Sequence, residues 1–458
     1  MTTIKLVISD LHLADGHAVL DGFGKYQQSA LEGLLNATST HDPLSQAGDV
    51  ELIINGDSFD FLTVPPYDSG GTTDAALAVE KLAKITAAHR PFFQALRTFI
   101  AQPRRRVTFI TGNHDIDLCF AEIRAGIYDA IGIEQSAETI QFCPTRFYRP
   151  LPDVYIEHGN AYDFWNRDIS ELWDAQGQPL TREPHSITLP AGSHYLQHAF
   201  LPINLAYPYI DHFEPSMSIL CQVALLSLIN PQIVIEMVQH TMELLAQPRK
   251  GLAYLAPGIE RIPARLFEQA MLDLAAFQQD AATRHPGWIE PPGINADRTR
   301  ADAMTEFAML REALTLPFLE AIAAVCAPAT YQMEESVGAG MHNVLRTDPT
   351  LRYAIAGHTH MLRIDPIKSE TREQQVYLNT GSWTTRVALP APWEITAEVA
   401  AWLRQPDWTN IPLRDATQFT FTLIEGERDE NQTHRSPSSA SLCAWEGGKN
   451  RHYRVLAG

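Results

Sequence analysis

The chain of 458 residues is 45% hydrophobic and 19% charged, which is the composition of a globular protein long enough to bury a large core. Its formal net charge of -19 argues against a general binder of nucleic acid or of anionic membranes, because both need clustered lysine and arginine. Five widely spaced cysteines without a CxxC pair disfavour a disulfide framework and favour a reducing, cytoplasmic setting.

Five short apolar runs predict five strands that are buried on both faces. In chain order they are Lys5–Ser9, Glu51–Asn55, Arg106–Thr111, Val154–Glu157 and Arg352–Ala356. The first run begins so close to the amino terminus that we expect no signal peptide. Residues that can bind metals follow each run at once, and ligands collect outside the carboxyl ends of such strands. We therefore expect the five segments to form one site.

Further elements are predicted between and after these runs. Apolar residues at helical spacing predict a helix over His89–Ile100, and a flexible loop over Asp68–Thr73 could border a substrate entrance. Strands are expected at Gln375–Leu378 and Phe419–Ile424, followed by a closing hairpin of 442–445 with 451–456.

The long interval before the fifth run is mostly helical in pattern, at 217–245, 260–279 and 301–325. We interpret it as a helical insertion, residues 166–345, within a core formed by residues 1–165 and 346–458. The insertion could be a cap over the site, or an appendage for packing or for a homo-oligomer. Its uncharged stretch Pro215–Ile235 contains too many polar residues for a transmembrane span. We expect that stretch to be buried in the cap, in a dimer interface or against a lipid-like substrate.

The residues that follow the five runs form a ligand set for two divalent cations. Asp10 and His12 are two positions apart and would project to the same side if the strand continued. Asp57 can bridge two ions with its two oxygens, and Asn113 offers an amide oxygen. Imidazoles come from His158, His358 and His360. This mixed set suits Mn²⁺, Fe or Zn²⁺, and two such ions about 3.5–4 Å apart would activate a water for in-line attack on a phosphoryl group.

The motifs resemble those of the calcineurin-like metallophosphoesterase superfamily, whose pattern is DxH, GDxxD, GNH(D/E), a His-Gly and GHxH. Here they read Asp10-Leu11-His12, Gly56-Asp57-Ser58-Phe59-Asp60, Gly112-Asn113-His114-Asp115, His158-Gly159 and Gly357-His358-Thr359-His360. The resemblance covers residues 1–160 and about 350–390. It implies an α/β (α+β) fold, a two-sheet metallophosphoesterase sandwich flanked by helices, here with the large helical insertion.

The resemblance also implies how the ligands divide between two ions. The first ion would be held by Asp10, His12, Asp57 and His360. The second would share Asp57 and add Asn113, His158 and His358.

Two residues carry catalytic roles in this resemblance. His114 would contact the phosphoryl group and protonate the leaving oxygen, and Asp60 could orient His114 and favour its protonated form. Alternatively, Asp60 has only a structural role, as a turn or capping residue.

The motifs also indicate which branch of the superfamily the chain resembles. Phe61 follows GDxxD where protein phosphatases usually have Arg, and Asp115 stands where they have Glu, which disfavours a protein phosphatase. The first two motifs are most similar to the UDP-2,3-diacylglucosamine hydrolase-like branch, which typically has Arg at the position of His114 and a much shorter insertion.

The sequence therefore predicts a binuclear metal-dependent phosphoesterase. We expect it to hydrolyse a small phosphodiester, phosphomonoester or pyrophosphate, which could be amphiphilic, by in-line attack of a hydroxide held by the metals. A non-catalytic scaffold with the same fold and a nuclease are the alternatives. The acidic balance and the lack of interleaved basic and aromatic residues weigh against the nuclease.

Several other residues are weaker candidates. His194 and His198 could share a helical face and bind a metal, but packing of that helix is the simpler interpretation. Arg146 and Arg149 could bind phosphate, whereas the run Arg104–Arg106 is more simply a solvated turn. The segment Asn379–Trp383 could support the metal ligands through hydrogen bonds.

Overall fold

The structure is a computed structural model that describes residues 2–214 and 333–457. It leaves out short stretches at 18–19, 41–43, 68–70, 136, 164, 168, 170, 181–183, 207–211, 368–374, 389–395, 405–406, 408–409, 428–437 and 448–452. The three helical segments predicted at 217–245, 260–279 and 301–325 lie outside the described residues, as does the uncharged stretch Pro215–Ile235.

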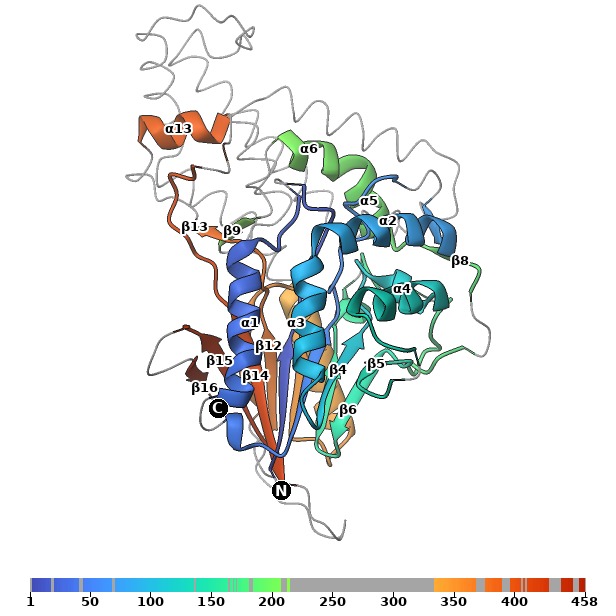
Figure 1. Cartoon of the computed structure of the whole chain (residues 1–458), viewed down its shortest axis with the longest axis vertical. Helices are drawn as coiled ribbons and strands as arrows, with labels where there is room; N and C mark the ends of the chain where they lie inside the picture. The colour runs from blue at the N-terminus through green and yellow to red at the C-terminus, as the bar shows by residue number, and fades with distance from the viewer. Residues whose placement is uncertain are drawn as a thin grey trace, which may run out of the picture. The chain divides into compact units, whose positions relative to one another are not determined.

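The described chain has a mixed α/β fold whose larger sheet has seven strands in the order β16-β15-β14-β1-β2-β4-β5 (Figure 1). Strands β1, β2, β4 and β5 are parallel to one another, whereas β14, β15 and β16 are joined to them and to each other antiparallel. In chain order the strands are β1 Thr2–Ile8, β2 Asp49–Asn55, β4 Arg105–Ile110, β5 Ile140–Phe142, β14 Thr420–Glu427, β15 Ser439–Trp445 and β16 Tyr453–Ala457.

A second sheet has five strands in the order β11-β12-β10-β7-β6. Its three central strands β12, β10 and β7 are parallel, and the two edge strands are antiparallel to their neighbours. Its strands are β6 Phe147–Leu151, β7 Val154–Glu157, β10 Tyr353–Ala356, β11 Leu362–Ile367 and β12 Gln375–Thr380. All five strands predicted from apolar runs are therefore present, β1, β2 and β4 in one sheet and β7 and β10 in the other.

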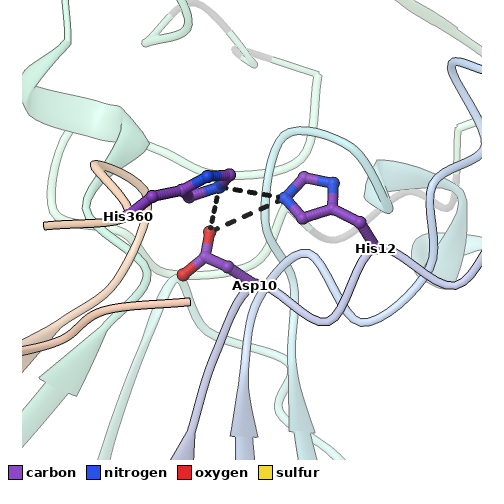
Figure 2. Close-up of side chains that lie close together, drawn as sticks. All are labelled: Asp10, His12 and His360. Atoms are coloured by element: carbon purple, nitrogen blue, oxygen red, sulfur yellow. Dashed lines mark hydrogen bonds and ion pairs between the residues drawn. The ribbon is translucent and has the colours of Figure 1, made fainter. Parts of the chain in front are cut away.

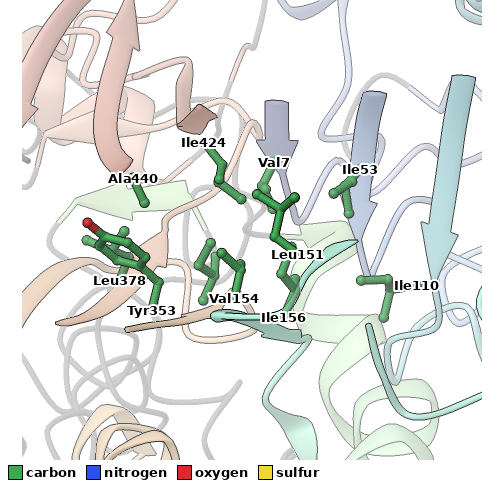
Figure 3. Close-up of a cluster of buried hydrophobic side chains, with 11 residues drawn as sticks. Val7, Ile53, Ile110, Leu151, Val154, Ile156, Tyr353, Leu378, Ile424 and Ala440 are labelled. Atoms are coloured by element: carbon green, nitrogen blue, oxygen red, sulfur yellow. The ribbon is translucent and has the colours of Figure 1, made fainter. Parts of the chain in front are cut away.

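The two sheets share a buried apolar core, which Figure 3 shows in close-up. Val7, Ile53 and Ile110 enter it from β1, β2 and β4, while Ile156 and Ile355 enter it from β7 and β10. Alternate residues of a strand point to opposite faces, so each of these strands also has apolar side chains on its other face. That double burial explains why the runs are continuously apolar rather than alternating.

Helices cover the other faces of the two sheets. Helix α3, Arg90–Ile100, contacts β4 and buries Phe92, Phe93, Leu96 and Phe99, and it lies beside α1, Lys25–Thr40 (Figure 1). Residues 333–347 are also helical and pack Val337, Met341 and Leu345 onto the second sheet. Further helical segments in this part are α2 Ala75–Ala88, α4 Ala121–Ile131, α5 Ala191–Tyr195, and the short turns η1 Leu44–Gln46, η2 Ile116–Cys119 and η3 Asn160–Tyr162.

The last two residues of the loop predicted at Asp68–Thr73 belong to a strand, and residues 68–70 lie outside the described residues. Thr72–Asp74 forms β3, which pairs antiparallel with β8, Ser186–Thr188, and Thr73 is buried. The carboxylate of Asp74 then caps helix α2 by accepting the backbone N–H of Leu77. The turn-forming Gly and Ser residues suggested a loop, but backbone pairing with a segment more than a hundred residues away decides the structure here.

The chain divides into two compact units. The first comprises Met1–His194, Met333–Thr385 and Thr417–Gly458, and contains both large sheets. The second comprises Tyr195–Gln332 and Arg386–Ala416. Its described elements are η4 Leu196–Phe200, α6 Leu201–Ala206, β9 Phe213–Glu214, β13 Val387–Ala388 and α13 Ala397–Arg404, with β9 and β13 paired. The predicted insertion over 166–345 stays a prediction, because most of it lies outside the described residues.

Candidate metal centre

The ligand candidates meet where the parallel strands end. Backbone pairing places Ile8 level with Ile54 and Asn55 level with Ile110, so the loops that follow β1, β2 and β4 begin at the same edge of the first sheet. The second sheet is tied to that edge, because the side-chain amide of Asn55 donates to the carbonyl of Glu157. The sequence alone predicted this convergence of loops from separate strands.

The first group of ligand atoms comes from Asp10, His12 and His360 (Figure 2). Nε2 of His360 lies 3.2 Å from Oδ1 of Asp10 and 3.0 Å from Nε2 of His12. Two imidazole nitrogens and a carboxylate oxygen thus point toward one another from segments almost 350 residues apart. Such a group of donors could hold a transition-metal or zinc ion.

The second group comprises Asp57, His158 and His358, and all three residues are buried. Nε2 of His158 lies 3.1 Å from Oδ2 of Asp57. Oδ1 of the ligand candidate Asn113 is buried and has no hydrogen-bond partner. Buried polar atoms are almost always satisfied, so an unsatisfied oxygen of this kind fits a bound cation.

The carboxylate of Asp57 lies between the two groups. Its Oδ2 is 3.9 Å from Nε2 of His12 and 3.1 Å from Nε2 of His158, whereas its Oδ1 accepts the backbone N–H of His114 at 2.8 Å. The sequence suggested a bridge that used both oxygens. Because Oδ1 is already hydrogen-bonded, Oδ2 is the oxygen of Asp57 that faces both groups.

The backbone at this site is strained. Among the residues that the structure describes, six other than glycine have a positive φ, and five of them are ligand candidates: Asp10, His12, Asp57, His358 and His360. The left-handed region is costly for residues with a Cβ atom, and such strain concentrates at functional sites. Asp10 and His12 are therefore not neighbours on one face of a continuing strand, as their spacing suggested, because β1 ends at Ile8 and both residues lie in left-handed turns.

Asp60 joins two of the histidines. Its Oδ1 lies 3.0 Å from Nδ1 of His114, and its Oδ2 lies 3.3 Å from Nδ1 of His12. Oδ1 also accepts the backbone N–H groups of Leu62 and Thr63, so Asp60 is a turn residue as well. Because Nδ1 of each ring is engaged by Asp60, Nε2 is the other nitrogen of each ring, and Nε2 of His12 lies in the first group.

Asp115, the last residue of the GNHD motif, ties two of the ligand loops together. Its Oδ1 accepts the backbone N–H of Gly112 at 2.7 Å, and its Oδ2 accepts that of Ser58 at 2.7 Å. These bonds fix the loop that carries Asn113 against the loop that carries Asp57.

The segment Asn379–Trp383, which begins with the last two residues of β12, contacts the ligand loops as the sequence suggested. The side-chain amide of Asn379 donates to the carbonyl of Gly357, and both Ser382 Oγ and the backbone N–H of Trp383 donate to the carbonyl of Asp10. The turns that present Asp10 and His358 are therefore supported from a sixth strand end.

Electrostatics at the site favour bound positive charge. Burial alone would raise the pKa of Asp57, but the rings of His158 and His114 hold it well below its usual range. Burial would lower the pKa of His158, and the Asp57 carboxylate instead raises it to about 10. In the same way, Asp60 and Asp57 overcome burial and raise the pKa of His114 to about 9. Closely packed carboxylates thus draw protons onto the histidines when no cation balances them.

Sequence reasoning missed Asp163. This buried carboxylate lies 3.1 Å from Nε2 of His358, one of the predicted ligands. Burial would raise its pKa, but the hydrogen bond from His358 lowers it. One sequence signal could have found it, because Asp163 is the only acidic residue within eight positions after His158.

The weaker candidates have other partners. Arg146 pairs with Glu157 and Arg149 pairs with Asp348, so neither guanidinium is held ready for phosphate. Arg104 lies in an exposed turn directly before β4, as expected for a solvated turn. The interpretation is wrong for the next two residues, because Arg105 is buried in β4 and Arg106 pairs with the buried Glu51. The side chain of His198 lies outside the described part of the chain, so its pairing with His194 stays a prediction.

Two general expectations can be compared with the described residues. Cys119, Cys143 and Cys443 form no disulfide, while Cys221 and Cys326 fall outside the described ranges. Within the part of the chain that the structure describes, no helix has the length and apolar character needed to cross a membrane.

Comparisons with known proteins found no match. No protein-family model matches the chain, and no curated protein is significantly similar to it.

Proposed function

We propose that this protein is a metal-dependent phosphoric ester hydrolase with two divalent cations in its site. The observation that carries the proposal is that six of the seven ligand candidates, from four strand ends, meet in two groups. Oδ2 of Asp57 lies 3.9 Å from Nε2 of His12 in the first group and 3.1 Å from Nε2 of His158 in the second. The buried Oδ1 of the seventh candidate, Asn113, has no hydrogen-bond partner, which supports the presence of a cation there.

The residues would divide between two ions as their contacts suggest. Asp10, His12 and His360 would hold the first ion, and Asn113, His158 and His358 the second, with Asp57 shared between them. Mn²⁺, Fe and Zn²⁺ all suit this set of oxygen and nitrogen donors. Two such ions would lower the pKa of a water and offset the negative charge of a phosphoryl group.

His114 is the proposed general acid. In the metal-free site Asp60 and Asp57 outweigh burial and raise the pKa of this ring to about 9. The hydrogen bond from Nδ1 to Asp60 fixes the ring and leaves Nε2 to donate a proton to the leaving oxygen. Asp60 acts through His114, so it is a positioning residue.

The substrate we propose is a small phosphodiester, phosphomonoester or pyrophosphate, and the setting is cytoplasmic. The formal net charge of -19 disfavours long nucleic acids, which bind through clustered cations. Neither a scaffold without activity nor a nuclease is favoured by a specific contact.

A substrate panel tests the proposal. The purified protein with Mn²⁺ should cleave a small diester or a nucleoside diphosphate sugar faster than single-stranded DNA, and Asp57→Asn should reduce the rate to that of buffer. Asp153→Asn is a matched control, because Asp153 is bonded to Ser438 and to none of the ligand candidates. No hydrolysis of any substrate would favour the scaffold, and preferential cleavage of DNA would favour the nuclease.

A further inference from the structure

The carboxylate of Asp163 is built into the structure as a fixed hydrogen-bond acceptor. Its Oδ1 accepts the backbone N–H of Trp165 at 3.1 Å, and its Oδ2 accepts the side-chain amide of Asn166 at 2.6 Å. Only 5% of Asp163 is exposed, so these bonds restrain the carboxylate in a place that solvent barely reaches. A buried charge that is held in this way is strongly directional.

This carboxylate receives the ring of His358. Nε2 of His358 lies 3.1 Å from Oδ2 of Asp163, and His358 is 8% exposed. An aspartate that is ionised only accepts, so the ring nitrogen must carry the proton of this bond. The other nitrogen, Nδ1, is then unprotonated in the neutral ring and is the one that can bind a cation.

The other histidine of the second group is arranged in the opposite sense. Nδ1 of His158 donates to the backbone carbonyl of Asn55 at 2.9 Å, which leaves Nε2 beside Asp57. Each of the two rings therefore has one nitrogen engaged by a protein acceptor and one left for a ligand. Of these two rings, His358 has a carboxylate as the acceptor of its engaged nitrogen, whereas His158 has a carbonyl. A carboxylate raises the basicity of a ligating ring more than a carbonyl does.

One short loop supplies both His158 and Asp163. The loop turns at Gly159, which has a φ of 114°, and η3 leads from there to Asp163. The amide of Asn160 donates to the carbonyl of Asn166 and closes the loop. A single loop after β7 thus contributes one ligand candidate and orients a second one that comes from β10.

We propose that Asp163 is a positioning residue of the second metal site, which accepts the Nε2 proton of His358 and thereby presents Nδ1 of that ring to the cation. This inference rests on the two-metal function proposed above. It predicts that Asp163 affects the second ion and not the first, because the ligand candidates of the first ion, Asp10, His12 and His360, form a separate group.

The experiment compares Asp163→Asn and Asp163→Ala with the wild type in Mn²⁺ titrations followed by calorimetry. Asn keeps an acceptor oxygen of the same shape, whereas Ala removes it. We expect the affinity for the second ion to fall about 10–100-fold in Asp163→Ala and less in Asp163→Asn, with the first ion unaffected. Asp365→Asn is the matched control, because Asp365 lies 3.1 Å from Nε2 of His342, which is no ligand candidate.

A second readout reports the ring itself. In the zinc-loaded wild type, nitrogen NMR should show His358 protonated at Nε2, and this state should be lost in Asp163→Ala while the protein still melts cooperatively. Wild-type affinity for both ions in Asp163→Ala, or an equal loss in Asp365→Asn, would overturn the role of Asp163 alone. A wild type that binds no divalent ion would overturn the proposed function together with this inference.

Discussion

The histidines at the site are distinguished by what engages their second nitrogen. Asp60 engages His114 and His12, the carbonyl of Asn55 engages His158, and Asp163 engages His358. Because each ring is fixed at one nitrogen, the tautomer and the direction of the other nitrogen follow. These contacts let single residues be assigned separate tasks, which substitutions can test.

Removing the ring of His114 should slow catalysis without removing the metals. We expect His114→Ala to lower kcat about 10²–10⁴-fold for an ester with a poor leaving group, because general acid catalysis contributes that much. The loss should be smaller for a nitrophenyl ester, whose leaving group needs no proton. Steady-state kinetics and metal analysis measure both effects, and loss of the metals in His114→Ala would contradict the role given to this ring.

Metal binding at the second group should release a proton from His158. In the metal-free protein the pKa of His158 is raised to about 10, because Asp57 outweighs burial. Below that pH the ring is protonated and a cation must displace the proton, so affinity should rise with pH, about tenfold per pH unit between pH 6 and 8. Calorimetry in buffers of different ionisation enthalpy counts the protons. A pH-independent affinity in this range would mean that His158 is not a ligand.

The ligand types could be predicted from residue identity, but their supporting contacts could not. Asp57 and His158 stand out because each directly follows an apolar run and its turn. Asp163 has no such signal beyond its proximity to His158, because its partner His358 is nearly 200 residues away. Whether Asp60 is a turn residue or orients His114 was likewise open, and its carboxylate makes both sets of bonds.

At the scale of the elements, the strands end abruptly in tight turns, and the turns present the ligands. Gly56 follows β2 with a φ of 78°, and a Cβ atom placed there would lie 2.2 Å from Nδ1 of His158. Only glycine permits both the left-handed backbone and the approach of the ring. The turn after β2 therefore sets the distance between Asp57 and His158.

Gly56→Ala should damage the second metal group and the stability of the fold. The backbone strain alone costs about 1–2 kcal/mol, and the clash with His158 adds to it. Gly447→Ala is the control, because Gly447 also has a positive φ but a Cβ atom there would meet nothing closer than 3.7 Å. Thermal unfolding and metal titration compare the two. Equal losses in both variants would show that the approach of His158 to Gly56 does not matter.

The strands could be predicted because their centres are buried on both faces and so are continuously apolar, as residues 52–54 of β2 and 354–356 of β10 are. The short strand β3 could not, because its residues Thr72–Asp74 form a strand only by pairing with β8 far along the chain. Local composition does not contain that information, and tertiary pairing overrides it.

On the scale of the whole molecule, the site belongs to one compact unit. All the ligand candidates lie in the unit formed by Met1–His194, Met333–Thr385 and Thr417–Gly458. Its two sheets come from distant parts of the chain, so the site forms only when those parts fold together. The order of the motifs along the chain could be read from the sequence. The division of the remaining residues between two units could not be deduced from composition.

The central claim is that this unit holds two divalent cations, and metal analysis of the purified, Mn²⁺-supplemented protein tests it most directly. We expect about two ions per chain after gel filtration. The number should fall below about one in Asp57→Ala, because Asp57 is the shared ligand. Hydrolysis of a small phosphate ester should follow the metal content. Less than about one ion per wild-type chain, with no activity restored by Mn²⁺, would contradict a site for two divalent cations.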